Sequence, residues 1–336
     1  MCYRFRHMTS PRKTSDHFDG KEFHNLYGVP AGGSLKDVLR WKFLGVGGPV
    51  AEWPKHAEGN TVQPALPDHL DDGTVAVTFV GHSTFLFQFG GGMNVLVDPV
   101  WSERVSPVTF AGPKRVRPPA IPFDMLPTIH TVLVSHGHYD HMDLATLRRL
   151  DERFSPRFIA GLGNREFLQT RGLKQVEELD WWQSCNLDAD WTVTFTPAQH
   201  WTSRTPTTRN RTLWGGFWMQ RTGGQKPSLY FAGDSGFNQH FALIRERLGA
   251  PDAAFLPIGA YEPRWFMREQ HMNPEDAVQA HLALGARQSV GMHFGTFQLT
   301  DEGIDEPAAK LAASLQAHGI DAARFRVPKF GETLFF

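Results

Sequence analysis

Four metal-binding side chains fall within six residues of the sequence, directly after a run that is typical of a buried strand. The run is Thr131–Val134, and the side chains are those of His136, His138, Asp140 and His141. The two histidines are two residues apart on an extended or turning chain and so project the same way, and the next two side chains turn back toward the same point. Imidazole suits zinc and carboxylate suits harder ions, so this mixture indicates a catalytic zinc site that also holds water.

A single histidine has an ordinary explanation, because most histidines lie at the surface or are satisfied within a core. The cluster does not, since His-x-His-x-Asp-His is expected by chance in only about two of a thousand chains of this length. Asp143 has a structural explanation, because it stands where a helix N-cap belongs, ahead of Leu144, Leu147 and Leu150 at helical spacing. The sequence thus predicts a strand, a ligand loop and a helix, in that order.

The composition predicts one large globular domain or two ordinary ones. The chain has 336 residues, and 41% of them are hydrophobic, which is enough for a sizeable core. Its 34 basic and 35 acidic side chains nearly cancel, so no overall field attracts nucleic acid or an anionic bilayer, and any such attraction must be local. The only cysteines, Cys2 and Cys185, exclude a disulfide framework and fit a reducing compartment.

The N-terminal sequence favours a soluble cytoplasmic protein. Residues 1–13 lack the continuous apolar segment of a secretory signal. No stretch of the chain approaches the ~18 uninterrupted apolar residues that a transmembrane helix needs. Peripheral membrane contact stays open, and so does the oligomeric state, for which a homodimer is one expectation.

Residues 1–72 differ from the rest of the chain. They are rich in Gly, Pro, Asp and Lys with little periodicity, which predicts an extended N-terminal arm packed on a catalytic domain of residues 73–336. Within the arm, residues 34–43 predict a helix that begins after a capping Ser34. Its apolar stripe, with Trp41 and three basic residues, either docks on the protein's own core or lies at a membrane interface.

The domain begins with an antiparallel meander. Three strands are predicted at residues 74–80, 84–89 and 95–97, with turn residues between them. A Pro-rich loop at 99–127 follows and carries Lys114, Arg115 and Arg117. This basic trio either meets an anionic ligand or lies on a solvated loop.

From residue 131 onward strands and helices alternate, and four of the strands run toward a candidate ligand. Further strands are expected at 157–160, 176–179, 191–196, 229–232, 288–292 and 332–336, and helices at 164–170, 273–285 and 307–318. The ligands that follow strand ends are His136, His200, Asp234 and His293. In a layered α/β protein, loops that leave one sheet edge gather on one face, so these side chains should meet. With the other motif residues they make five histidines and two aspartates, which fill the eight positions of two four-coordinate metals if Asp234 is shared.

The motif and its distant partners resemble the metallo-β-lactamase superfamily, and within it the branch of phospholipases D that hydrolyse N-acylphosphatidylethanolamine. The resemblance runs from about residue 73 to the C-terminus and implies an αββα sandwich. Outside the motif it is carried by residues 81–84 (Gly-His-Ser-Thr), 98–99 (Asp-Pro), 112–115 (Gly-Pro-Lys-Arg), 179–182 (Leu-Asp-Trp-Trp), 199–201 (Gln-His-Trp), 231–234 (Phe-Ala-Gly-Asp), 257–267 and 293–297 (His-Phe-Gly-Thr-Phe).

The resemblance implies two zinc ions and assigns their ligands. The first zinc would be bound by His136, His138 and His200 and the second by Asp140, His141 and His293, with Asp234 between them. It also places Tyr139 where it can meet the substrate. The histidine at position 138 stands where the di-iron branch has a glutamate, and this favours zinc over iron.

Charge supports a hydrolase of anionic phosphodiesters. Two zinc ions carry four positive charges, and Asp140, Asp234 and a bridging hydroxide remove three, which leaves about one net positive charge in the pocket. The metals lower the pKa of the bridging water, so that a hydroxide can attack in line at phosphorus, and Asp140 can orient it. Asp98 either fixes the tautomer of a ligand histidine or forms the turn before Pro99.

Substrate contacts are the least specific part of the prediction. Residues 260–267 combine aromatic and apolar area with one guanidinium, which suits a lipid tail beside a phosphate, so Tyr261 and Arg264 are candidates. Core packing, with Arg264 in a structural ion pair, is the alternative. Arg204, four residues after His200, has the same two interpretations, as a substrate contact or as a structural residue.

Three functions follow from these observations. The first is hydrolysis of N-acylphosphatidylethanolamine to N-acylethanolamine and phosphatidate through a metal-bridging hydroxide. The second is lactone or soluble phosphodiester hydrolysis with the same metals. The third is a catalytically silent scaffold, whose mark would be the loss of one or more ligands, and all seven are present.

Overall fold

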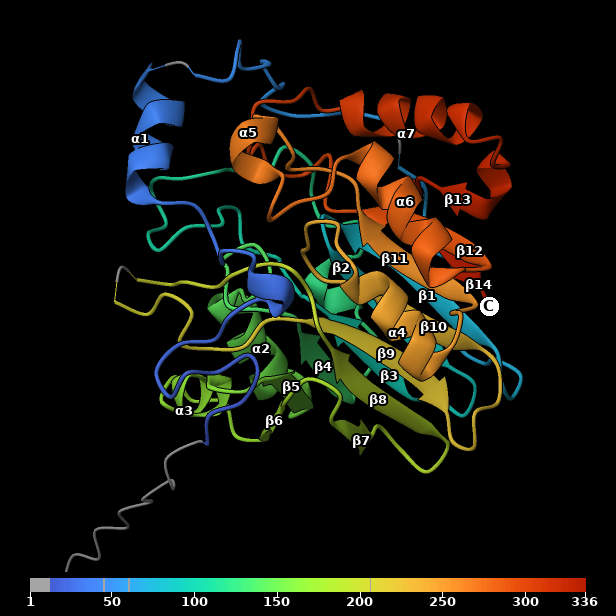
Figure 1. Cartoon of the computed structure of the whole chain (residues 1–336). Coiled ribbons are helices and arrows are strands. Elements are labelled where there is room, and N and C mark those ends of the chain that lie inside the picture. The colour runs from blue at the N-terminus through green and yellow to red at the C-terminus, as the bar shows by residue number, and fades with distance from the viewer. Residues whose placement is uncertain (1–12, 45, 60, 206) are drawn as a thin grey trace, which may run out of the picture.

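Two sheets packed face to face, with helices on both outer faces, make up the fold (Figure 1). The computed structural model describes residues 13–336 except 45, 60 and 206. Cys2 and residues 1–12, which bear on the expectations about disulfides and a signal segment, lie outside the described residues. The predicted αββα sandwich is confirmed.

The first sheet contains the motif strand. Among the described residues it has seven strands in the order β14-β1-β2-β3-β4-β5-β6. Their bounds are β1 Val75–Gly81, β2 Thr84–Phe89, β3 Asn94–Val97, β4 Thr131–Val134, β5 Arg157–Gly161, β6 Val176–Leu179 and β14 Thr333–Phe335. The predicted meander is confirmed, because β1, β2 and β3 pair antiparallel, and β3 to β6 then run parallel.

The second sheet contributes the distant ligands. Its seven described strands follow the order β13-β12-β11-β10-β9-β8-β7. Their bounds are β7 Ser184–Asn186, β8 Trp191–Thr196, β9 Gly216–Arg221, β10 Ser228–Phe231, β11 Ala253–Pro257, β12 Gln288–Met292 and β13 Phe325–Arg326. Strands β10, β11 and β12 are parallel neighbours, so the loops that follow β10 and β12 leave the same edge of the sheet.

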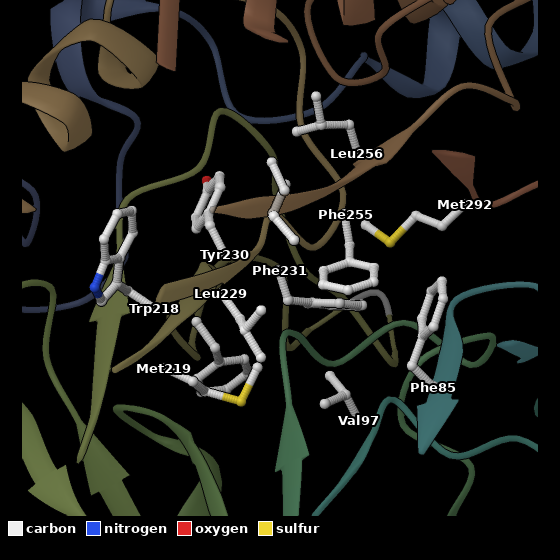
Figure 2. Close-up of a cluster of buried hydrophobic side chains, with 14 of the residues drawn as sticks. Phe85, Val97, Trp218, Met219, Leu229, Tyr230, Phe231, Phe255, Leu256 and Met292 are labelled. Atoms are coloured by element: carbon white, nitrogen blue, oxygen red, sulfur yellow. The ribbon is translucent and has the colours of Figure 1, made fainter. Parts of the chain in front are cut away.

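Alternating side chains of the first sheet divide between two cores. In β2, Phe85 and Phe87 face the second sheet, while Leu86 between them packs in the separate cluster that includes α2. Figure 2 shows Phe85 beside Phe255 of the second sheet, and their ring centroids are 5.0 Å apart. Phe85 is 1% exposed, so its truncation to alanine would cost about 3–5 kcal/mol.

The helices cover the outer faces and form one further group beside the site. They are α1 Leu35–Leu44, α2 Leu144–Phe154, α3 Asn164–Gln169, α4 His240–Leu248, α5 Arg264–Met267, α6 Pro274–Leu284 and α7 Glu306–Ala317, with 3-10 turns η1 Leu26–Gly28, η2 Phe123–Met125 and η3 Ala322–Arg324. Helices α2 and α3 lie on the first sheet and α4, α6 and α7 on the second (Figure 1). The predicted caps are confirmed: Asp143 accepts from the first turn of α2, and Ser34 Oγ accepts from the Asp37 N–H at the start of α1. Asn273 caps α6 in the same way.

The described part of the N-terminal arm lies along the domain. Trp41 in α1 packs against Phe266 of α5 in a tilted arrangement, with ring centroids 5.4 Å apart, and the Trp53 indole donates to the carbonyl of Glu302. Helix α1 therefore docks on the protein through Trp41. No helix among the described residues is long and apolar enough to span a bilayer.

The arginines of the basic loop bond to the protein itself. Arg115 donates to the carbonyl oxygens of Val100, Ser102 and Arg117, and Arg117 donates to that of Gly295. Burial lowers the pKa of Arg115 to about 10, so it stays charged at neutral pH. These side chains hold the loop against the domain instead of extending into solvent.

Candidate metal centre

The four ligand-bearing loops follow β4, β8, β10 and β12, and they meet as the strand pattern predicts. Backbone strain accompanies this convergence, because His82, Asp98 and His293 all have positive φ values, of 57°, 43° and 62°. Gly137 is required between the first two histidines, since a Cβ there would lie 2.6 Å from Thr202 Oγ1.

The first ligand set is built from three histidines. His138 Nδ1 lies 2.9 Å from His136 Nε2 and 3.2 Å from His200 Nε2. Nitrogens bound tetrahedrally at about 2.05 Å from a zinc ion would be about 3.3 Å apart. The three atoms therefore have the spacing of ligands on one metal.

The second set gathers around a carboxylate. Asp140 Oδ2 lies 3.2 Å from His293 Nε2 and 3.4 Å from His141 Nε2. A further histidine, His82, brings its Nε2 to 3.0 Å from the same oxygen. This set thus combines imidazole and carboxylate donors.

Asp234 stands between the two sets. Its Oδ2 atom lies 3.1 Å from Nε2 of both His141 and His293, and 3.9 Å from Nε2 of both His136 and His200. This is the placement expected of a shared ligand, and all seven residues predicted as ligands are brought together.

Hydrogen bonds behind three histidines fix their tautomers. His141 Nδ1 donates to Asp98 Oδ2 at 2.7 Å, and His200 Nδ1 donates to the carbonyl of Gln270 at 2.9 Å. Ser135 Oγ donates to Asp98, so it accepts from His136 Nδ1 at 2.9 Å. In the neutral form, each of these imidazoles presents the lone pair of its Nε2 to the site, an arrangement that repels unless a cation or proton lies between the nitrogens.

Asp98 therefore acts behind the ligands. It fixes the tautomer of His141, as one of the two sequence interpretations expected, and it also adopts the strained backbone of a turn. Both of its oxygens are used, because Oδ1 accepts from the Ser135 N–H at 2.7 Å.

The two sets differ in protonation. Burial and neighbouring imidazoles hold the pKa of His136 and of His200 well below the usual 6.5. Burial also lowers the pKa of His293, but Asp234 and Asp140 outweigh it and raise that pKa to about 9. The pKa of His141 is likewise raised well above 6.5 by Asp234, Asp140 and Asp98, against the effect of burial. Protons on the second set thus occupy positions that a metal cation would take.

Two histidines at the centre were not predicted as ligands. His82 follows β1, so the rule of a ligand after a strand end could have found it, but it entered only as part of a resembling segment. His271 Nδ1 lies buried without a hydrogen-bond partner among the described residues, 3.8 Å from Asp234 Oδ2. It follows helix α5 and no strand, so no sequence pattern marks it.

The three predicted substrate contacts, Tyr139, Tyr261 and Arg264, differ from one another in burial and in their partners. Tyr139 is partly exposed beside the motif, and its hydroxyl donates to the carbonyl of Arg204 at 2.8 Å. Tyr261 is fully buried, with its hydroxyl on Glu306. Arg264 pairs with Asp276 at 2.6 Å, which is the ion pair of the structural alternative.

The guanidinium of Arg204 supports the motif loop through hydrogen bonds to its backbone. It donates to the carbonyls of Gly137 and Met142, both at 2.9 Å, and its guanidinium lies 4.1 Å from the centre of the Tyr139 ring. The two carbonyls bracket His138, Asp140 and His141, so this arginine closes the part of the loop on which three of the ligands stand.

Comparison with known proteins finds a matching family model, similar sequences and similar solved structures. A family model described as a β-lactamase superfamily domain matches residues 93–294. An N-acyl-phosphatidylethanolamine-hydrolyzing phospholipase D of Caenorhabditis elegans is 38% identical over 261 residues, which are 74% of this chain and 72% of that protein. The mitochondrial enzyme of that name in Saccharomyces cerevisiae is 33% identical over 250 residues, 73% of this chain and 53% of that protein. Among solved structures, the metallo hydrolase Igni18 of Ignicoccus hospitalis superposes with a TM-score of 0.59 and 24% identity, covering 78% of this chain and 98% of that chain.

Proposed function

The chain belongs to the metallo-β-lactamase superfamily of metal-dependent hydrolases, and from this premise we propose that it is a dinuclear zinc phosphodiesterase of the phospholipase D type. The proposed substrate is N-acylphosphatidylethanolamine, cleaved to N-acylethanolamine and phosphatidate. The observation that carries the proposal is the meeting of seven side chains in two ligand sets that share Asp234. The names of the nematode and yeast relatives support the substrate.

The ligand sets suit the proposed reaction. Zinc ions in both sets would act as Lewis acids toward a phosphoryl oxygen and lower the pKa of water. Imidazole with carboxylate is a donor set that zinc accepts, and the lone pairs fixed toward the site call for a cation. Asp234 holds the two sets together.

Asp140 is the proposed residue that orients the attacking water. Its side chain is 13% exposed, against 2% for Asp234, so it is the carboxylate nearer to solvent. Burial raises its pKa, but His141, His293 and His82 outweigh burial and hold that pKa well below the usual range. It therefore stays ionised and accepts hydrogen bonds, as this role requires.

Tyr139 is the substrate contact that we propose at the rim of the site. Its ring is held by Arg204 and lies beside the partly exposed His138. For Tyr261 and Arg264 we propose an indirect role, because their partners Glu306 and Asp276 make them supports of the segment at 260–267.

An apolar and basic patch beside the site is the proposed lipid contact. It consists of the exposed side chains Leu39, Leu44, Val46 and Trp265, with the basic Arg40 and Lys42. Arg40 lies 5.2 Å from the Trp265 ring, and the Trp265 indole donates to the carbonyl of Val46. Only three residues separate α5 from His271 at the centre, so a bilayer on this patch would lie close to the ligands.

Vesicles that contain N-acylphosphatidylethanolamine provide the direct experiment. We expect release of N-acylethanolamine and phosphatidate, two zinc ions per chain by elemental analysis, and loss of turnover in His136→Ala. A γ-lactone and a soluble bis-aryl phosphodiester serve as competing substrates. Turnover of either of these without cleavage of the phospholipid would refute the lipid assignment. Fewer than two metals per chain, with His136→Ala fully active, would refute the metal centre.

A further inference from the structure

Asn25 brings a buried side-chain amide against the backbone of the ligand His200, although 175 residues separate the two. It lies just before η1, in the N-terminal segment and outside the residues that the family model matches. Its side chain is 5% exposed. An amide buried so far from its sequence neighbours needs hydrogen-bond partners to offset the loss of water.

Four hydrogen bonds fix this amide. The oxygen accepts from the His200 N–H at 3.0 Å and from the Trp214 indole at 3.1 Å. The nitrogen donates to the carbonyl of His200 at 2.9 Å and to that of Pro30 at 3.4 Å. Both groups that contact the amide oxygen are N–H donors, and both groups that contact the amide nitrogen are carbonyl acceptors. This pattern determines the orientation of the amide.

The Asn25 amide makes the hydrogen bonds to the His200 peptide groups that a neighbouring strand would make within a sheet. His200 lies beyond the end of β8 and is fully buried, so its peptide N–H and C=O require partners. One side-chain amide satisfies both. Leaving either group buried and unpaired is unfavourable enough to displace the backbone that carries the ligand.

The N-terminal segment is anchored by other contacts as well. Arg209 donates to the carbonyls of Ala31 and Gly33, both at 2.9 Å. Gly32 has a φ of +82°, and a Cβ there would lie 2.7 Å from the Trp201 ring. Removing the Asn25 amide would therefore leave the segment in place and take away its bonds to His200, together with those to Trp214 and Pro30.

We propose that Asn25 is a positioning residue for the first ligand set, an inference that rests on the proposed metal centre. His200 Nε2 must stay near His138 Nδ1, now 3.2 Å away, for both to bind one metal. The second set has its own support, because His141 bonds to Asp98 and the His293 N–H donates to the carbonyl of His82. Loss of the amide should thus weaken one metal position and spare the other.

Zinc titration of the metal-free full chain against a chromophoric chelator measures the two positions separately. The variants are Asn25→Ala, which loses all four bonds, and Asn25→Asp, which keeps the acceptor and loses the donor. Asn94→Ala is the matched control, because Asn94, at the start of β3, is also a buried amide and donates to the carbonyl of Thr128. Urea unfolding of each metal-free variant reports whether it is folded, and the Co²⁺ absorption spectrum reports the ligand geometry.

We expect Asn25→Ala to weaken one zinc equivalent by about 10- to 100-fold and to alter its Co²⁺ spectrum, with Asn25→Asp in between and Asn94→Ala like the wild type. Equal weakening of both equivalents, or wild-type affinity for both in the folded Asn25→Ala protein, would overturn the inference. A wild-type protein that binds one equivalent would refute the dinuclear proposal alone, since Asn25→Ala should still weaken that equivalent. A wild-type protein that binds none would refute both.

Discussion

The two halves of the metal centre are held in different ways. The first set has three imidazoles and no carboxylate of its own, and burial lowers the pKa of His138 to about 4 against the charges of Asp140 and Asp234, so its ligands are neutral near pH 7. The second set is built around Asp140, and there Asp234 and Asp140 raise the pKa of His141 and His293 against the effect of burial. The negative charge that attracts a cation is thus concentrated in one half.

Their supports differ as well. In the second set, His141 rests on Asp98, which follows β3 in the same sheet as the motif. In the first, His200 comes from the other sheet, and its backbone is bonded to Asn25 of the N-terminal segment. The difference teaches that the second half contains a carboxylate of its own, whereas the first has none and depends on Asn25 to hold the backbone of His200. Substitutions can separate these two dependences.

Asp234→Asn should have the largest effect, because it removes the one carboxylate that both halves share. We expect kcat/KM to fall by about 10³-fold, which corresponds to the several kcal/mol that metal stabilisation contributes. Zinc content by elemental analysis should also fall below two per chain. Retention of more than a tenth of the activity with full zinc content would show that the halves do not depend on this carboxylate.

Asp98→Asn should affect the second half more strongly than the first. An amide in place of Oδ2 would face the His141 Nδ1–H with a donor or a weaker acceptor, and the favoured tautomer would be lost. Zinc binding by this half should weaken by about 10- to 100-fold in a chelator competition. The effect on His136 is indirect and passes through Ser135, so Ser135→Ala is the matched control and should weaken only the first half.

Sequence reasoning finds what short-range patterns encode. The residues 84–89 predict a strand of the meander, and the structure has β2 there, with alternate side chains buried in two separate cores. The cap residue Asp143 and four of the ligands, His136, His200, Asp234 and His293, follow from the same rules, because each stands next to the end of a regular element. The short motif marks the other three ligands.

Elements without a local pattern escaped prediction. Strand β11 has the sequence Ala-Ala-Phe-Leu-Pro, whose alanines and proline have low strand propensity, and it becomes a strand because it is buried between β10 and β12. His271 and Asn25 reach the centre only through tertiary packing. Tyr261 and Arg264 looked suited to a lipid, but Glu306 and Asp276, which they contact, lie 12 or more positions away along the chain.

Arg204→Met tests a side chain that supports the loop carrying ligands of both halves of the metal centre. The substitution keeps the apolar stem but removes two hydrogen bonds to the carbonyls of Gly137 and Met142. We expect the free energy of unfolding to fall by about 2 kcal/mol and both zinc affinities to fall together by less than about tenfold. Selective loss of one affinity would show that the loop does not move as a unit.

His17→Phe should have the smallest effect and should depend on pH. His17 ties the N-terminal segment to the domain, because its Nδ1 lies 2.6 Å from Asp16 and its Nε2 lies 2.8 Å from Asp180, while the ring stacks on Trp181. Burial lowers the pKa of His17, but the bonds and charges of Asp180 and Asp16 outweigh burial and raise it above 6.5. A raised pKa in the folded state means that this stabilisation is fully present below pH 6.5 and is lost as the pH rises through the folded-state value.

Phenylalanine at position 17 keeps the stacking and removes the charge, so the variant isolates the ion pairs. Urea unfolding at pH 6, 7.5 and 9 should show a difference of about 1 kcal/mol at pH 6 that shrinks toward pH 9. The metal ligands titrate in both proteins, so their contribution cancels in the difference. A difference near zero at all three pH values would mean that stacking alone holds the segment. The first half of the centre would then depend on Asn25 and Arg209 without help from His17.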